Sequence, residues 1–181
     1  MAELREIIEG CKRKDRRYQD ELYRKYSAML FGLCLRYTKS REEAEDVLQE
    51  GLVKIYKSIG SYSMSNSFEG WMRRIVINTA ITHYRKNLKH AYHEDITEMS
   101  HNSVSTPDDF SNEFSREELL NVINKLPDGY RIVFNMYVVE GYKHKEISEI
   151  LGIDINTSKS QLSRAKKYLQ RELELLSKIN L

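Results

Sequence analysis

The chain contains little proline and little glycine, with 2 Pro and 8 Gly among 181 residues. An all-β fold of this size needs many tight turns, and turns draw on these two residues, so the shortage favours helices. No stretch approaches the roughly 20 apolar residues of a membrane-spanning helix, and the N-terminal sequence MAELREIIEG lacks the apolar core of a signal peptide. We therefore expect an all-α, cytoplasmic protein that does not insert into a membrane.

Cysteine and metal-ligand patterns are equally sparse. Cys11 and Cys34 have no paired or metal-binding spacing, so we expect a reducing compartment and no disulfide framework. His90 and His93 are close in sequence, but no second pair of ligands accompanies them, and we interpret both as surface residues. The sequence predicts no metal and no other cofactor.

Charge is unevenly distributed behind a net charge of only +2. Residues 1–90 carry 18 Lys or Arg against 12 Asp or Glu, a net of +6; residues 91–120 carry 1 against 8, a net of −7; and residues 121–181 carry 10 against 7, a net of +3. The middle stretch HNSVSTPDDFSN is polar and shows no helical period. The pattern predicts two small helical domains, residues 1–90 and 115–181, joined by a flexible linker over residues 91–114.

A basic segment near the C-terminus, INTSKSQLSRAKKYLQR over residues 155–171, contains five Lys or Arg and no acid. As a helix it places Leu162, Ala165 and Leu169 on one stripe. The opposite side carries short hydroxyls, an amide and cations, which suit phosphates and base edges: Asn156, Lys159, Ser160, Ser163, Arg164 and Lys167. A solvated amphipathic helix is the alternative.

The preceding segment makes a helix-turn-helix pattern with this helix. KHKEISEIL over residues 143–151 is amphipathic, Gly152 suits the left-handed end of a helix, and Asp154 or Asn156 could cap the next one. Two short helices joined by such a turn, the second basic, are typical of duplex DNA readers. Ser148 and Ser158 weaken the pattern, because small or branched apolar residues normally close this contact between helices.

The first domain is expected to be a helical bundle. One helix runs from about Asp15 to Tyr37, and another follows Ser40, which with Glu43 forms a capping-box pattern. The second helix turns Ala44, Val47, Leu48, Leu52 and Ile55 inward. Its acidic first turn suits the helix dipole, but Asp46, Gln49 and Glu50 lie beyond that turn and form either a docking face or a solvated one.

A second basic helix, WMRRIVINTAITHYRKNLKH over residues 71–90, follows a Ser-rich segment that carries Tyr62 and Phe68. One side is apolar, with Met72, Val76, Ala80 and Tyr84. The other side combines an aromatic ring, an amide and cations, as a single-stranded nucleic acid requires: Trp71, Arg74, Asn78, Thr82 and Arg85. For Trp71 alone, a role as a core anchor is slightly favoured.

The second domain should begin with a capping box formed by Ser115 and Glu118, on a helix that ends near Leu126. A further helix over roughly residues 131–140 should turn its apolar side inward: Ile132, Val133, Met136 and Tyr137. With the helix-turn-helix pair these make a four-helix domain, and no β-sheet is expected.

Four strings in this order and spacing carry a resemblance: EEAEDVLQEGLVKIYKSI, SFEGWMRRIVINTAITHYRK, LPDGYRIVFNMYVVEGYKHKEISEILGI and NTSKSQLSRAKKYLQREL. The chain resembles a two-domain sigma factor of bacterial RNA polymerase, of the extracytoplasmic-function (ECF) type of the sigma-70 family, over about residues 20–171. This resemblance implies a non-enzymatic initiation factor whose partners are core RNA polymerase, promoter DNA in duplex and single-stranded form, and an anti-sigma factor.

The resemblance also implies roles for individual residues. Core polymerase would bind Asp46, Gln49 and Glu50. The minus-ten element would contact Tyr62, Phe68, Trp71, Arg74, Asn78 and Arg85. The minus-thirty-five element would contact Asn156, Lys159, Ser160, Ser163, Arg164 and Lys167. Three departures bear on which promoter is read: Thr82 replaces an acid found in many members, Ser158 replaces Val, and Gln161 replaces a common Arg.

Two other classes of protein remain as alternatives. A transcriptional regulator could bind DNA through the second domain and sense a signal through the first, which would require a ligand pocket or a phosphoacceptor. A metal-dependent helical hydrolase could use Glu43, Asp46 and His83, but the sequence lacks the paired Glu-x-x-His motifs of di-metal bundles.

Overall fold

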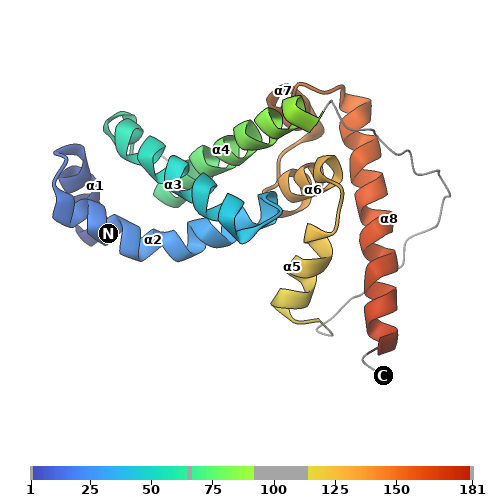
Figure 1. The fold of residues 1–181 in the computed structure, drawn as a ribbon. Helices are drawn as coiled ribbons and strands as arrows, with labels where there is room; N and C mark the ends of the chain where they lie inside the picture. The colour runs from blue at the N-terminus through green and yellow to red at the C-terminus, as the bar shows by residue number, and fades with distance from the viewer. Residues whose placement is uncertain (1, 65–66, 92–113, 180–181) are drawn as a thin grey trace. The chain divides into compact units, whose positions relative to one another are not determined.

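The structure is a computed structural model that describes residues 2–64, 67–91 and 114–179. All elements in these ranges are helical (Figure 1): α1 (Ala2–Lys12), α2 (Arg16–Tyr37), α3 (Arg41–Ser58), η1 (Ile59–Ser61), α4 (Phe68–Ala91), α5 (Arg116–Asn124), α6 (Asp128–Phe134), η2 (Asn135–Val139), α7 (His144–Leu151) and α8 (Ile155–Ile179). The expected all-α class is confirmed. Residues 92–113 of the expected linker, with His93, lie outside the described residues.

The helices form two compact units, residues 1–90 and 91–181. None of the described helices combines the length and apolar character needed to cross a membrane.

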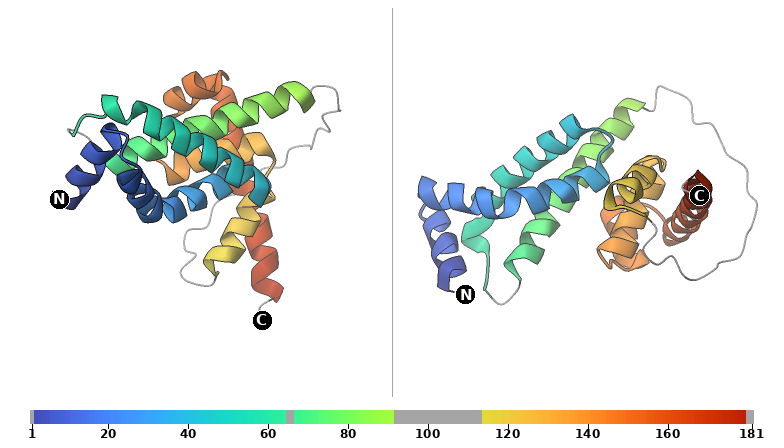
Figure 2. Two further views of the ribbon diagram at one scale, coloured as in Figure 1. Left: turned by 60° about the vertical axis from the view of Figure 1, so that its left-hand side comes forward. Right: turned by 90° about the horizontal axis from the view of Figure 1, so that it is seen from below.

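In the first unit, α2 and α3 run back along each other after a short connection at residues 38–40, and α4 packs beside α3 (Figures 1 and 2). Of the inward residues predicted for α3, Ala44, Val47, Leu52 and Ile55 are buried, and Leu48 is half-buried. Gly51 allows the close approach of α4, because a Cβ atom there would lie 3.1 Å from Val76 Cγ2. The apolar stripe of α4 completes the core, with Met72, Val76 and Ala80 buried.

The helix α1 packs against α2 at the start of this unit. It buries Ile7, Ile8 and Cys11. At Gly10 the ring of Tyr18 lies so close that an added Cβ would be 2.1 Å from the ring atom Cδ2, so only glycine fits there. The chain reverses after α1 through Lys14, whose φ of 61° lies in the left-handed region.

The second unit is built around α8. Val122 and Leu126 from the α5 end pack against Ala165 and Leu169, as the stripe predicted for α8 requires. Arg131 is 2% exposed, and its guanidinium donates to Asp128 Oδ1 at 2.9 Å and to the Asn124 carbonyl at 3.3 Å. This buried cation ties the beginning of α6 to the end of α5.

Helix capping follows the sequence at one site and departs from it at another. The box at Ser115 is complete, since Ser115 Oγ accepts from Glu118 N at 3.2 Å and Glu118 Oε2 accepts from Ser115 N at 2.8 Å. At Ser40 only the hydroxyl half forms, accepting from Glu43 N at 3.2 Å. The Glu43 carboxylate instead accepts from Lys39 N, one residue earlier, at 3.0 Å.

The helix expected over residues 131–140 is not regular, and the prediction that Tyr137 points inward is wrong. The α-helical part α6 ends at Phe134, and the five residues of η2 form a π-helical turn. Because a π-helix turns through fewer degrees per residue, it rotates the residues that follow away from the α-helical stripe. Met136 stays fully buried while Tyr137 is 39% exposed.

Candidate polymerase and nucleic-acid interfaces

The helix-turn-helix forms in the second unit as the sequence predicts. α7 ends at Gly152, which adopts φ 67° and donates its N–H to the Ser148 carbonyl at 2.8 Å. Asp154 caps the next helix, since its Oδ1 accepts from Asn156 N at 2.7 Å. The expected turn and the expected cap are therefore both present.

The predicted polar face of α8 lies at the surface of this unit. Asn156, Lys159, Ser160, Ser163 and Arg164 are exposed and Lys167 is half-buried, whereas Leu162, Ala165 and Leu169 are buried on the other side. Exposed cations and short polar side chains on one side of an anchored helix fit a DNA groove.

Two side chains of α8 are braced by the start of α6. The Arg164 guanidinium donates to the Tyr130 hydroxyl at 3.3 Å, and this hydrogen bond holds the Arg164 side chain against α6. The Gln161 amide nitrogen lies next to Gly129, where an added Cβ would be 3.1 Å from it. Gln161 thus packs on α6.

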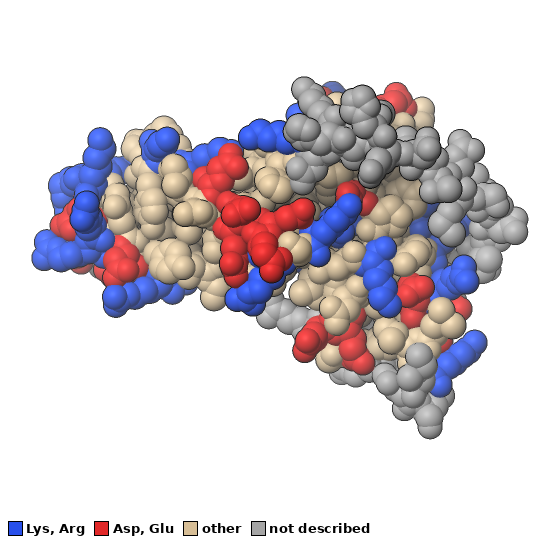
Figure 3. Space-filling view, viewed as in Figure 1, with Lys and Arg blue, Asp and Glu red and all other residues tan. Residues whose placement is uncertain are grey.

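The acidic face of α3 is formed by Asp46 and Gln49, both exposed, with Glu50 half-buried beside the exposed Val53. Figure 3 shows acidic side chains gathered over the first half of this helix. Glu50 pairs with Lys54 at 2.8 Å, and the hydrogen bond from Lys54 lowers the pKa of the Glu50 carboxyl. Lys54 also donates to the buried Thr79 on α4 at 3.2 Å, so Glu50 is held in place by the core side of the unit.

An aromatic cluster lies where η1 meets α4. The Tyr62 and Phe68 rings meet edge-on at 5.0 Å between centroids, Trp71 stacks on Phe68 at 5.6 Å, and Tyr26 from α2 adds an edge contact to Phe68 at 5.9 Å. Tyr62 is 8% and Phe68 3% exposed, and Trp71 is half-buried. In this conformation Tyr62 and Phe68 brace the segment between η1 and α4 and show little surface to a ligand.

The polar face of α4 lies beside this cluster. Arg74, Asn78, Thr82 and Arg85 are exposed, on the side opposite to the buried stripe. The Thr82 hydroxyl donates back to the Asn78 carbonyl at 2.8 Å, which satisfies it within the helix. The side chain of His90, at the end of α4, lies outside the described residues.

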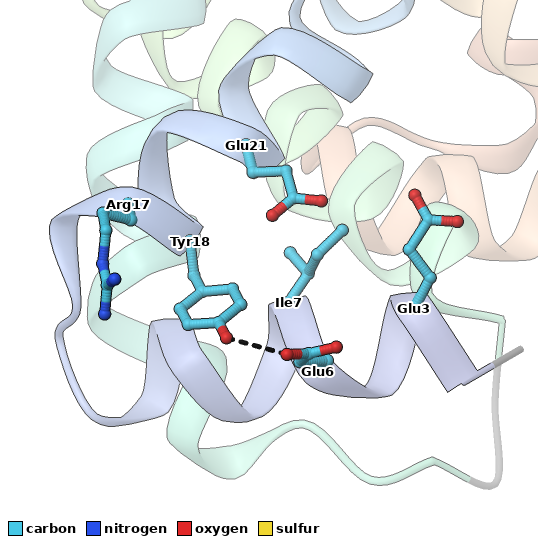
Figure 4. A pocket seen from close by; sticks show the side chains of 6 residues that line it. All are labelled: Glu3, Glu6, Ile7, Arg17, Tyr18 and Glu21. Atoms are coloured by element: carbon cyan, nitrogen blue, oxygen red, sulfur yellow. Dashed lines mark hydrogen bonds between the residues drawn. The ribbon is translucent and has the colours of Figure 1, made fainter.

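A pocket of about 280 Å³ opens between α1 and α2 (Figure 4). Its lining is mainly water-exposed and charged, with Glu3, Glu6, Arg17 and Glu21 around Ile7 and Tyr18. The Tyr18 hydroxyl donates to Glu6 at 2.9 Å, and the Arg17 guanidinium pairs with Asp15. This lining lacks the apolar walls typical of a small-molecule sensor.

Metal-binding geometry is likewise absent from the part of the chain that the structure describes. No three His, Cys, Asp or Glu side chains there come together in an arrangement that could hold a metal ion. The set Glu43, Asp46 and His83, considered for a hydrolase, is therefore not assembled.

Comparison with known proteins decides the family. The family model for sigma-70 region 2 matches residues 22–89, and that for sigma-70 region 4 matches residues 116–169. The ECF RNA polymerase sigma factor SigM of Bacillus subtilis is 31% identical over 83% of this chain and 92% of its own length. This chain belongs to the ECF sigma factors. Members of the family are non-enzymatic factors of transcription initiation that act with RNA polymerase and bind DNA through region 4.

Other relatives of this sigma factor agree. The RNA polymerase sigma-H factor of Pseudomonas aeruginosa is 28% identical over 94% of each chain. Among solved structures, the sigma factor RpoE of Bartonella quintana, crystallised with the anti-sigma factor NepR, matches 86% of this chain and 96% of its own with a TM-score of 0.54 at 21% identity. At this identity the structural match speaks for the fold alone.

Sequence reasoning missed several contacts of this sigma factor. Tyr26 recurs at helical spacing in the helix expected from about Asp15 to Tyr37, but its ring contact with Phe68 was not expected. Tyr130, which contacts Arg164, was not singled out. In both cases the partner lies on a distant helix. His144 was also missed, although its Nδ1 lies 2.9 Å from Ser158 Oγ. A signal did exist for this pair: a serine in a slot that is normally apolar needs a polar partner nearby.

Proposed function

We propose that this sigma factor reads its promoter at two separated places while bound to core polymerase. Residues 115–181 bind the minus-thirty-five element as duplex DNA, residues 1–90 bind core polymerase and the minus-ten element as a melted strand, and residues 91–114 tether them. The observation that carries the proposal is the face of α8, exposed and cationic on one side and anchored by Ala165 and Leu169 on the other.

Duplex reading uses that face directly. Asn156, Lys159 and Ser160 lie in the first two turns of α8, the part of a recognition helix that contacts base edges. Ser163, Arg164 and Lys167 continue the same side toward phosphates. The brace from Tyr130 limits the number of rotamers that Arg164 must give up on binding, which lowers the entropic cost of the contact.

Strand capture uses the exposed side of α4. Arg74 and Arg85 attract phosphates, and Asn78 offers donors and an acceptor to an unpaired base. Trp71, half-buried against Phe68, presents part of its ring next to this face, whereas Tyr62 and Phe68 form the floor beneath it. Each base that stacks on an aromatic ring contributes about 1–3 kcal/mol, so binding the open form selectively drives melting.

Polymerase docking uses the acidic face of α3, where Asp46 and Gln49 project and Glu50 is fixed by Lys54. Docking places both DNA-binding domains on one assembly. Once the first has bound, the second binds at a high effective concentration, so two weak contacts become one strong and selective one.

A protein inhibitor is the expected regulator. The sigma factor RpoE was solved in complex with the anti-sigma factor NepR, and CnrH in complex with the cytosolic domain of CnrY, at TM-scores to this chain of 0.54 and 0.51. We propose that an anti-sigma factor likewise holds this chain and competes with core polymerase for it. The test is whether a protein that elutes with the chain from its own cells is displaced by added core enzyme.

The test of duplex reading uses the full chain with core polymerase from its own cells. A pool of duplexes, randomised upstream of the start site, is enriched for binding to this holoenzyme, and the enriched duplex is compared with a scrambled one. Arg164→Ala should weaken binding of the enriched duplex by about tenfold and lower the salt slope by about one. Lys178→Ala, which removes a charge at the far end of α8, serves as the control and should change neither.

Failure of the pool to yield any enriched duplex would contradict the proposed function. An unchanged affinity and salt slope for Arg164→Ala would contradict the assignment of the α8 face.

A further inference from the structure

The contact between the two helices of the helix-turn-helix includes a buried polar residue. Ser158 lies on the buried side of α8 and is fully buried. A buried hydroxyl without a partner is costly, on the order of 1–3 kcal/mol. Its partner is His144, the first residue of α7, whose Nδ1 lies 2.9 Å from Ser158 Oγ. This hydrogen-bond contact links the start of α7 to the start of α8.

The other side of the His144 ring is held by Tyr137. The two rings stack at 4.4 Å between centroids with 24° between their planes. Tyr137 reaches this position because it belongs to the π-turn η2, which rotates it out of the buried stripe that contains Met136. Single π-turns within helices often occur at functional sites. Here the turn supplies Tyr137, which with Ser158 holds the His144 ring in place; we call these three side chains the clamp.

The clamp lies directly behind residues proposed to read DNA. Ser158 stands immediately before Lys159 and two residues after Asn156, both exposed on the opposite side of the same turn. A shift of this turn relative to α7 would move both side chains relative to the groove. Base contacts tolerate little displacement, because they depend on hydrogen-bond geometry.

We propose that His144 is a positioning residue for promoter recognition: clamped between Tyr137 and Ser158, its ring sets where the first turn of α8 lies in the DNA groove. This inference rests on the proposed duplex reading by α8. It assigns a role to Ser158, a buried hydroxyl in the contact between α7 and α8: the polar pair makes the alignment of the helices directional, where an apolar contact would allow sliding.

Partial burial of the imidazole is consistent with this role. It lowers the pKa of His144, and the neighbouring Lys159 lowers it further. The ring is therefore neutral near pH 7, so that Nδ1 and the Ser158 hydroxyl form one hydrogen bond between neutral groups without adding charge to the interface.

The test separates alignment from stability. With the holoenzyme at fixed salt and pH 7.5, the ratio of affinities for the enriched and the scrambled duplex is measured for three variants. His144→Phe keeps a ring against Tyr137 but lacks the nitrogen, and Ser158→Ala lacks the hydroxyl; both should lower the ratio by about tenfold. His144→Asn keeps a polar atom close to the position of Nδ1 and should retain the ratio within about threefold.

Ser115→Ala is the matched control, because it removes the cap of α5 in the same unit without touching α7 or α8. It should lower the Tm of the unit and leave the ratio unchanged. An unchanged ratio in His144→Phe, an equal loss in Ser115→Ala, or an equal loss in His144→Asn and His144→Phe would each overturn the inference. If the wild-type chain prefers no duplex, the proposed function fails first and this inference with it.

Discussion

Both cysteine side chains lie in the core of the first unit, where burial makes them poor nucleophiles. Burial, with smaller contributions from the Glu21 and Asp15 carboxylates, raises the pKa of Cys11 to about 11, and burial raises that of Cys34 to about 12. The thiolate is the reactive form, and it is scarce at these values. We therefore expect iodoacetamide at pH 8 to leave both thiols unlabelled in the folded chain and to label both in urea, as followed by mass spectrometry. Stoichiometric labelling of either thiol without urea would contradict the described core.

The imidazole of His144 makes the stability of the folded chain depend on pH, and the direction of this dependence follows from the groups around the ring. Its pKa in the folded chain lies below the ordinary value of 6.5, because of burial and then Lys159. The unfolded chain binds the proton more tightly, so this contribution to stability is complete above pH 6.5 and is lost as the pH falls through the lowered pKa. The Tm of the wild-type chain should fall more on acidification from pH 7.5 to 5.5 than that of His144→Asn, which does not titrate.

An NMR titration of the His144 ring, assigned by its loss in His144→Asn, measures the same property directly. A midpoint at or above 6.5 would mean that the ring is not enclosed as described.

At the scale of elements, the docking of α1 depends on one glycine. In an open helix Gly10→Ala would be stabilising by about 1 kcal/mol through helix propensity. Here the new Cβ would meet the Tyr18 ring at 2.1 Å, so we expect a net loss of about 1–3 kcal/mol in the stability of the first unit. The fluorescence of Trp71, the single tryptophan, reports this unfolding in urea.

Gly60→Ala is the control for this change, since nothing lies within 4 Å of its added Cβ. It should leave the urea midpoint nearly unchanged. Equal midpoints for Gly10→Ala and the wild type would show that α1 does not pack on α2 as described.

A second prediction at this scale concerns the acidic face of α3. Replacing Asp46 and Gln49 together by Ala should weaken binding to core polymerase by about tenfold, the order expected for central interface residues, without changing the Tm, because both side chains are exposed. The affinity is measured with labelled chain and purified core enzyme. Glu9→Ala, an exposed acid on α1, is the control; an equal effect of the two changes would point to overall charge rather than to this face.

Much of this architecture follows from the sequence because its helices are amphipathic and carry clear caps. Once α8 is helical, Leu162, Ala165 and Leu169 necessarily share one side of it, and all three are buried. Ser115, a residue type that favours the N-cap position, marks the start of α5. The π-turn could not be predicted, because Tyr137 fits an α-helical stripe and only the tertiary contact with His144 favours the rotated position.

Among the residues proposed to bind the melted strand, sequence periodicity could not separate surface from core. Tyr62 lies in a segment without helical period, and the helix was expected to begin at Trp71, whereas α4 begins at Phe68. Spacing therefore did not indicate that Phe68 packs on Tyr62 and on Tyr26. The α1 helix was not delimited either, although Leu4, Ile7, Ile8 and Cys11 recur at helical spacing. The roles of Tyr62 and Phe68 in DNA binding stay predictions.

At the scale of the whole molecule, the proposed function is divided between the two helical units. We propose that the unit with α8 supplies duplex recognition and that the unit with α3 and α4 supplies polymerase docking and strand capture. Because the two activities reside on different units, a change on α4 should alter opening and leave duplex recognition intact, and a change on α8 should do the reverse.

The central claim is that this sigma factor directs core polymerase to a promoter and holds the melted strand with α4. The most direct measurement is permanganate footprinting of unpaired thymines, on the enriched promoter with holoenzyme containing the wild-type chain or Asn78→Ala. The account predicts reactive thymines at the minus-ten element with the wild type, and several-fold weaker reactivity with Asn78→Ala at equal duplex occupancy. Absence of reactive thymines with a wild-type holoenzyme that occupies the duplex, or equal reactivity in Asn78→Ala, would contradict it.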